Sequence, residues 1–387
     1  MGFISIGKID KNLIPIIVGC IFSFLSRLLF TYKGTILFDH PLIDNIAASL
    51  SKFFSFFPIV FMTIQSCREN QMVKRNKNLH KFKYIYTNKK SQINRGKYPY
   101  IILSSIIFFI QGSILFFTIS LKTNVYIWNI LITCIFFTLI FKVKLYRHHY
   151  LSIILIILTG FVLDLASENL QNDIENNFTS LLLRFIREIV FSLHDIINKY
   201  AMENKFCSVH EIALYSGLIC LILFLLFSLL SYHYWDFDNF SDYFNNFNIT
   251  ELLVLIAYFI TQYGLYIGAL LTNKNNTPCH IFIIYIFGQL AYYIDFSINS
   301  IIVFICLLVI LFMSLIFNEI IEINFWGLSH NTRRNIIKRG ENEEANIYKI
   351  DTFDENDENS ANLGEVDENN ENLVEVNNII KNEDIYN

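Results

Sequence analysis

Ten apolar runs, each close to the length that crosses a lipid bilayer, dominate the 387-residue sequence. A helix needs about 20 apolar residues to cross the hydrocarbon core, and helices satisfy their backbone hydrogen bonds internally. The runs therefore predict an all-α, polytopic bundle of transmembrane helices. We expect spans near residues 13–31, 44–66, 100–121, 124–142, 149–167, 177–200, 209–231, 250–271, 279–296 and 298–320.

The amino-acid composition agrees with lipid as the solvent for much of the chain. Hydrophobic residues make up 53% of the sequence and charged residues only 17%, whereas an ordinary soluble domain is about 25% charged. Phe alone occurs 38 times. A soluble protein of this size has no interior that would hide so much apolar surface from water.

Basic residues set the expected orientation in the membrane. The loop at residues 68–98 is rich in Lys and Arg, which marks a cytoplasmic loop. Alternation then places both termini in the cytoplasm and leaves the endoplasmic reticulum, the Golgi and the plasma membrane as possible sites. The same loop is expected to contact anionic lipid. Glycosylation sequons occur on the opposite side, at Asn177, Asn239 and Asn248.

The end of the chain differs in composition from the rest. Residues 341–387 hold 2 of the 30 Lys and Arg and 15 of the 34 Asp and Glu, so residues 1–340 carry the other 28 and 19. A segment this acidic and this poor in aromatics cannot bury enough apolar surface to offset the entropy of ordering. We therefore expect a transmembrane domain over 1–340 and a disordered acidic cytoplasmic tail over 341–387.

The span at 177–200 is the most informative, because it carries many charged side chains. They share an arc of about 160° on a helical projection, opposite an apolar face. The arc contains Arg184, Arg187, Glu188, His194, Asp195 and Lys199. Each charge inside a membrane costs at least about 2.5–3.5 kcal/mol, so such residues face a cavity or a partner charge.

Three interpretations of this helix are open. It can line a solute path, with Arg184 or Arg187 holding an anionic group and Glu188 or Asp195 holding a proton or a hydroxyl. It can instead be a structural helix neutralised by pairs four residues apart, such as Arg184 with Glu188. It can also lie in the interface plane, which would leave nine spans and place the tail outside.

Polar residues in later spans extend the candidate path. The expected lining residues are Gln262, Tyr266 and Gln289. Gly264 and Gly268 also form a small-residue face that permits close helix packing. No catalytic set is recognisable, and the adjacent His194 and Asp195 are poor candidates for a dyad. We expect no enzyme activity, no cofactor, no metal site and no nucleic-acid partner, and we interpret Arg147-His148-His149 as a basic membrane anchor.

Ten helices with cytoplasmic ends, divided five plus five, resemble the drug/metabolite transporter superfamily, which includes nucleotide-sugar and sugar-phosphate carriers. The stretch REIVFSLHDIINKYAM at 187–202 looks like the polar opening helix of a second repeat. The resemblance implies that 1–167 and 177–320 are inverted repeats with a substrate site between them near the midplane.

These features predict an integral membrane transporter that moves a small polar or anionic metabolite along a central path lined by the sixth span. The alternative is a multi-pass receptor or scaffold that binds partners through its cytoplasmic loop and tail. A membrane-embedded enzyme that acts on lipid is a third class, and it would need a nucleophile or a metal cluster.

Overall fold

The structure is a computed structural model of the chain. It describes residues 4–6, 11–32, 41–75, 96–118, 127–168, 178–230, 249–293 and 298–323, together with 328, 332 and 335. The tail at 341–387, the three sequons and most of the basic loop at 68–98 lie outside these residues.

The described residues form a bundle of helices, as predicted. The elements are η1 (Lys11–Leu13), α1 (Ile14–Tyr32), α2 (Pro41–Ser51), η2 (Lys52–Ser55), α3 (Phe56–Arg75), α5 (Tyr98–Thr118), α6 (Ile127–Phe141), α7 (Arg147–Glu168), α8 (Phe178–Asn204), α9 (Val209–Leu230), α11 (Ile249–Asn275), α12 (Pro278–Gln289), η4 (Leu290–Tyr293) and α13 (Ile298–Phe317). Because α2, η2 and α3 are continuous, as are α12 and η4, the described chain has ten helical segments. Each begins within three residues of its predicted start.

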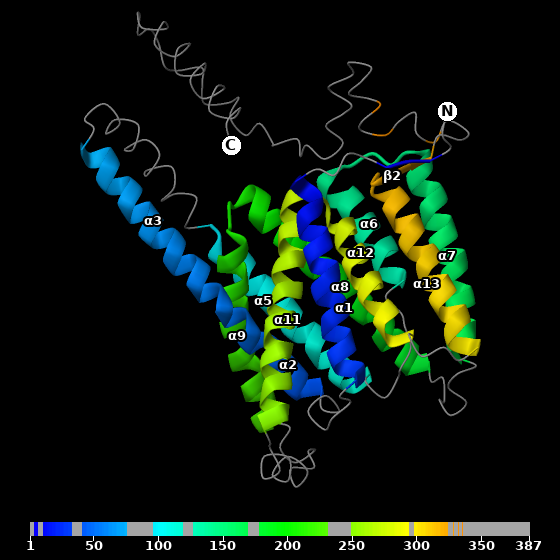
Figure 1. The fold of residues 1–387 in the computed structure, drawn as a ribbon, viewed down its shortest axis with the longest axis horizontal. Helices are drawn as coiled ribbons and strands as arrows, with labels where there is room; N and C mark the ends of the chain where they lie inside the picture. Colours follow the sequence, from blue (N-terminus) through cyan, green and yellow to red (C-terminus); the bar gives the residue numbers. More distant parts are fainter. Residues whose placement is uncertain are drawn as a thin grey trace, which may run out of the picture. The chain divides into compact units, whose positions relative to one another are not determined.

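A small sheet that the sequence did not predict joins the segment before the first helix to the segment after the last helix. Strand β1 (Ile4–Ile6) pairs antiparallel with β2 (Ile321–Ile323), and Ile4 lies opposite Ile323. The beginning of α1 and the end of α13 therefore lie at the same end of the bundle (Figure 1). We call it the sheet end. Helices that start and finish at one end make an even number of passes.

Buried polar contacts tie other helix ends together at the sheet end. The Lys97 ammonium, just before α5, lies 2.8 Å from the Glu211 carboxylate in the first turn of α9. Burial alone would lower the pKa of Lys97, but its hydrogen bond to Glu211 and the nearby charge hold that pKa above its usual value. The amide of Asn276, after α11, donates to the carbonyl of Asn12, before α1, at 2.9 Å.

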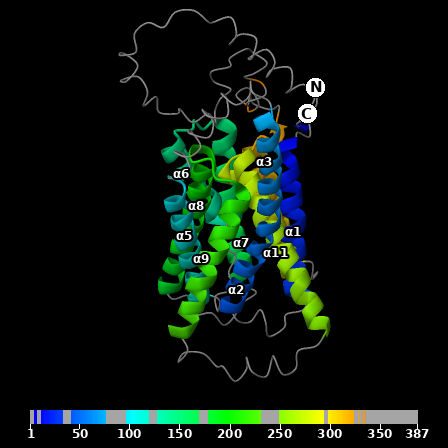
Figure 2. The same cartoon turned by 90° about the vertical axis from the view of Figure 1, so that its left-hand side faces the viewer.

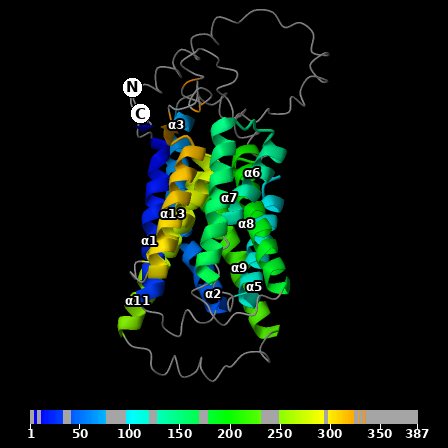
Figure 3. The ribbon, with the colours of Figure 1, turned by 90° about the vertical axis from the view of Figure 1, so that its right-hand side faces the viewer.

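Neighbouring helices pack along the length of the bundle. Helix α8 contacts α5 and α6 along its length and also meets α11 (Figure 2). Viewed from the other side, α13 lies beside α7 (Figure 3). The largest apolar cluster belongs to this second region and joins α6, α7, α12 and α13 through buried residues such as Ile156, Phe282 and Ile310.

The second helical segment changes from α-helix to 3-10 helix partway along its length. Helix α2 packs on α9, and the chain then makes the 3-10 turn η2 before α3 departs from the other helices at an angle (Figure 1). The side chains of residues 61–65 in α3 are all exposed. The turn therefore marks the point where the chain leaves the packed bundle.

Three helices of the described chain are long and apolar enough to cross a membrane, by length and composition alone. They cover Asn45–Gln65, Val209–Leu230 and Leu252–Asn275. Six further apolar helices are shorter, and α8 belongs to neither group because of its charges.

The predicted small-residue face of α11 is confirmed. Helices α1 and α11 cross so closely that a Cβ atom added to Gly268 would lie 2.8 Å from the Cα of Gly19. One turn earlier, a Cβ atom on Gly264 would lie 2.5 Å from the ring of Phe22. Only a residue without a side chain permits this approach of two backbones.

We expect Gly268→Ala to lower the free energy of unfolding by about 1–3 kcal/mol, because the added methyl group meets backbone that cannot rotate away. Gly264→Ala is the matched control. Its methyl group meets a side chain, which can shift, and alanine also favours the helix. Thermal unfolding of the purified protein in detergent would measure both. A Gly268→Ala protein as stable as the Gly264→Ala protein would contradict this account of the crossing.

Candidate functional site

Helix α8 turns its polar face into the bundle. Glu188, Ser192 and Asn198 are at most 1% exposed, whereas Phe185 on the opposite face is 46% exposed. This is the reverse of a helix at the surface of a soluble protein, and it matches a helix whose outer side meets lipid. Helix α8 also packs between α5 and α6, which favours a position inside the bundle over one in the interface plane.

Two of the described ion pairs of α8 join residues that are adjacent in the sequence. Glu188 pairs with its neighbour Arg187 at 3.0 Å, and the Asp195 carboxylate lies 3.6 Å from the adjacent His194 ring. The side chain of Arg184 lies outside the described residues. Adjacent residues point about 100° apart on a helix, but in each of these pairs the two side chains bend toward each other. The prediction that His194 and Asp195 are poor candidates for a catalytic dyad stays a prediction.

Lys199 has a structural role at the sheet end. Its ammonium pairs with the Glu203 carboxylate rather than with Asp195. It also donates hydrogen bonds to the carbonyls of Lys274 and Asn276, at 3.3 and 2.6 Å. These carbonyls close the end of α11, where unpaired backbone acceptors attract a cation. Lys199 thus fastens α8 to α11.

Small polar side chains hold α8 to its two neighbours. The Asn129 amide and the Thr133 hydroxyl of α6 donate to the Ser192 hydroxyl at 3.2 and 3.0 Å. The Ser104 hydroxyl of α5 donates to the Asn198 side chain at 2.6 Å. Glu188 is less completely bonded, because its Oε2 atom is buried and accepts no hydrogen bond from the part of the chain that the structure describes. Helix α8 is thus hydrogen-bonded to α5 and α6, while one carboxylate oxygen of Glu188 is left without a hydrogen bond to the described residues.

A buried lysine that the sequence reading missed lies in the same interior. Lys52, the first residue of η2, is 1% exposed, and its Nζ atom has no hydrogen-bond partner. The Nζ atom lies 3.4 Å from the centre of the Phe108 ring and 4.0 Å from that of Tyr266. Lys52 is the sole Lys or Arg within the predicted span 44–66, and that signal should have drawn attention to it.

The structure brings some of the predicted path residues together. The Tyr266 hydroxyl lies 3.2 Å from the Ser216 hydroxyl of α9. The Phe108 ring that covers Lys52 also lies 5.6 Å from the His194 ring. Lys52, Phe108, His194 and Tyr266 therefore form one connected group, which we call the central cluster.

The other predicted lining residues have separate positions. The Gln262 amide donates to the Ser26 hydroxyl at 2.9 Å and so links α11 to α1. Gln289 is buried on α12. An apolar hollow of about 450 Å³ opens elsewhere, between the η2–α3 segment and α9. It is lined by Phe53, Phe56, Phe57, Leu214, Tyr215 and Leu218.

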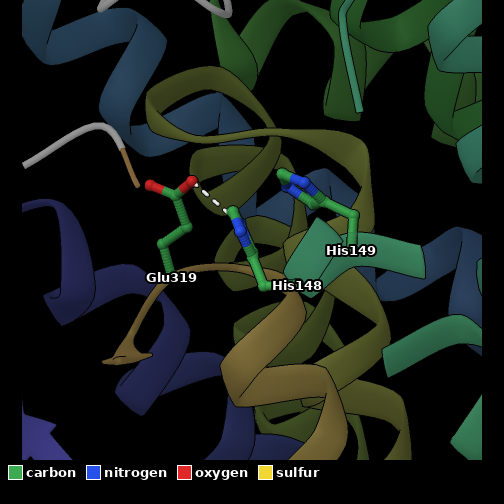
Figure 4. Close-up of side chains that lie close together, drawn as sticks. All are labelled: His148, His149 and Glu319. Atoms are coloured by element: carbon green, nitrogen blue, oxygen red, sulfur yellow. Dashed lines mark hydrogen bonds and ion pairs between the residues drawn. The ribbon is translucent and has the colours of Figure 1, made fainter. Parts of the chain in front are cut away.

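Two histidines and a glutamate meet at the sheet end (Figure 4). His148 and His149 begin α7, Glu319 follows α13, and one donor atom from each lies within 4.8 Å of the others. The His148 Nε2 atom lies 3.1 Å from the Glu319 carboxylate. Two histidines and a carboxylate are residue types that bind Zn²⁺. Glu319 is far from the histidines in the sequence and lies near them only in the folded chain.

The hydrogen bonds of His149 argue against a resident metal. Its Nδ1 atom accepts the backbone N–H of Tyr146 at 3.0 Å, as a side chain does when it caps a helix start. A neutral ring that accepts at Nδ1 carries its proton on Nε2, so that nitrogen has no free lone pair for a metal. We interpret His149 as a helix cap and the His148–Glu319 contact as the link between α7 and α13.

We therefore expect saturating ZnCl₂ to leave the melting temperature of the purified protein unchanged. His149→Ala should lower the free energy of unfolding by about 1 kcal/mol, as the loss of a helix cap does. Calorimetry with and without zinc measures both effects. A zinc-dependent rise in melting temperature that Glu319→Gln abolishes would show that the cluster is a metal site.

No protein-family model matches the chain, and no curated protein matches it at a significant level. Function is therefore inferred from the side chains themselves. The central cluster and the buried polar face of α8 contain two charged groups, Lys52 and Glu188, that each have a buried atom without a hydrogen bond to the described residues.

Proposed function

We propose that the chain is a multi-pass integral membrane protein that carries a small polar or anionic solute along a path lined by α8. The observation that carries this proposal is the orientation of α8, with charged groups buried and large apolar side chains exposed. Charges at this depth cost free energy unless they serve a partner or a water-filled path. The incompletely bonded Glu188 supports a path.

The described helix ends support ten spans with both ends in the cytoplasm. The even number of passes implied by the β1–β2 pair fits ten spans and disfavours nine. Basic residues in the connections at the sheet end favour that end as the cytoplasmic one. They include Lys97, Lys142, Lys144, Lys205 and Lys274.

The drug/metabolite transporter resemblance stays part of the proposal, with inverted repeats over 1–167 and 177–320. An irregular helix near the midplane is a feature of carriers that alternate access, and the 3-10 turn η2 is a local irregularity within a continuous helical segment. Contact of the basic loop with anionic lipid, the disordered tail and glycosylation at the sequons are proposed with it.

One observation favours the alternative of a receptor or scaffold without transport. Arg187, His194 and Lys199 each have a carboxylate partner within α8 itself. A helix neutralised in this way needs no solute, and its charged pairs should be replaceable by apolar pairs.

The orientation predicts the side from which introduced cysteines react. In a cysteine-free background, Lys144→Cys and Lys274→Cys at the sheet end should react with an impermeant maleimide only from the cytoplasmic side. Leu230→Cys and Ile249→Cys, whose native side chains are 82% and 76% exposed at the other end, should react only from the opposite side. Reaction of all four from one side would refute the spanning arrangement.

Paired substitution of Arg187 and Glu188 separates a carrier from a scaffold. Glu188→Met alone should cost about 3–5 kcal/mol, because it removes a carboxylate partner from a buried guanidinium, whereas Arg187→Met/Glu188→Met should recover most of that stability. For a carrier, the double variant should lose uptake of nucleotide sugars, sugar phosphates or amines into proteoliposomes.

The matched control for this experiment is Lys97→Met/Glu211→Met, which replaces a partly buried ion pair at the sheet end and should keep uptake. A folded Arg187→Met/Glu188→Met protein that transports normally would remove α8 from the path. No uptake of any solute by the unmodified protein would favour the scaffold.

A further inference from the structure

The 3-10 turn η2 contains two buried polar groups that form no hydrogen bond with any described residue. One is the Lys52 ammonium and the other is the Ser55 hydroxyl, which is 0% exposed. Residues three apart on a 3-10 helix lie on the same side of it, so both groups belong to one face of η2. Buried polar groups are almost always hydrogen-bonded, and two exceptions on one turn call for an explanation.

The position of Lys52 adds to the anomaly. Lys52 follows 11 residues of α2, which at about 1.5 Å per residue places it near the middle of a hydrocarbon core about 30 Å thick. No described carboxylate lies within ion-pair distance of its ammonium, and two aromatic rings cover it instead. Ring contacts offset only part of the cost of burying a cation.

The tip and the stem of Lys52 have different neighbours. Phe108 and Tyr266 are each only partly buried, although the ammonium itself is sealed. Gly217 of α9 lies against the stem of Lys52, so close that an added Cβ atom would be 2.8 Å from the Cβ of Lys52. The stem is thus fixed by backbone, while the tip rests on two side chains that can rotate. Phe108 also faces His194 on the polar side of α8.

We propose that Lys52 and Ser55 form the subsite that holds the carboxylate or phosphate group of the transported solute. The inference rests on the proposed carrier function and narrows its solute to an organic anion. The ammonium leaves the two rings and donates a charge-assisted hydrogen bond to the anion, and the serine hydroxyl donates a second one. The anion supplies the negative charge that no described residue places beside the Lys52 ammonium. Lys52 thereby makes the path selective for anionic solutes.

Binding of anions to the purified full-length chain tests this subsite directly. The probes are sodium phosphate and sodium succinate, compared with sodium chloride at equal ionic strength, and the readout is the melting temperature in detergent. We expect one of the two probes to raise the melting temperature in a saturable way. Lys52→Met should increase the apparent Kd of that anion by about tenfold or more, which is the loss of one charge-assisted contact.

Three further variants keep the test decisive. Ser55→Ala, a small change at the same turn, should weaken anion binding several-fold and covers the case in which Lys52→Met fails to fold. Lys52→Arg keeps the charge and should retain most of the binding. Lys97→Met, the matched control, removes a different buried lysine and should leave anion binding unchanged. Without any anion, Lys52→Met should melt at the same temperature as the unmodified protein or higher, because it removes an uncompensated buried charge.

Each outcome separates the subsite from the carrier. Equal anion-dependent stabilisation in the unmodified, Lys52→Met and Ser55→Ala proteins would overturn the subsite, as would the absence of stabilisation by both probes. Anion binding that depends on Lys52, without any flux into proteoliposomes, would uphold the subsite and refute transport. Flux of an anionic solute that Lys52→Met leaves intact would uphold the carrier and refute the subsite.

Discussion

The interaction on which the bundle depends is the burial of the polar side of α8 against α5, α6 and α11. The outward surfaces of these helices are apolar, so a charge on α8 gains nothing by turning outward and must find its partner inside. This constraint places α8 within the bundle, aligns Ser192 with Asn129 and Asn198 with Ser104, and joins Lys199 to the end of α11. The helices around α8 are held by these hydrogen bonds as well as by their apolar contacts.

The described connections at the sheet end are held by several kinds of contact. At the sheet end, capping side chains, ion pairs and the β1–β2 pair fix the connections, and several helices meet through short turns. Three of these turns place a residue other than glycine at positive φ: Lys142 after α6, Phe206 after α8 and Glu319 after α13. A positive φ at the end of a helix lets the following backbone N–H groups close its last carbonyls.

Two charged side chains away from the helix ends have a buried atom that no described residue hydrogen-bonds. Glu188 on α8 and Lys52 on η2 are opposite charges on separate elements, and each has a buried polar atom without a hydrogen bond. Such groups reduce stability unless a ligand, water or a second conformation completes them. A path for a polar solute through an apolar body needs groups of this kind, because a fully satisfied interior would have no reason to bind anything.

The sequence by itself determined the features that depend on neighbours along the chain. Apolar run length predicted the ten helical segments, the 3.6-residue period predicted the two faces of α8, and the spacing of Gly264 and Gly268 predicted a close helix crossing. Only the tertiary structure decided which distant groups meet. Lys52 with the Phe108 and Tyr266 rings, His148 with Glu319, and β1 with β2 each join residues far apart in the chain. A side chain's partner depends on how whole helices pack, and one sequence contains the periodicity of each helix but not their mutual placement.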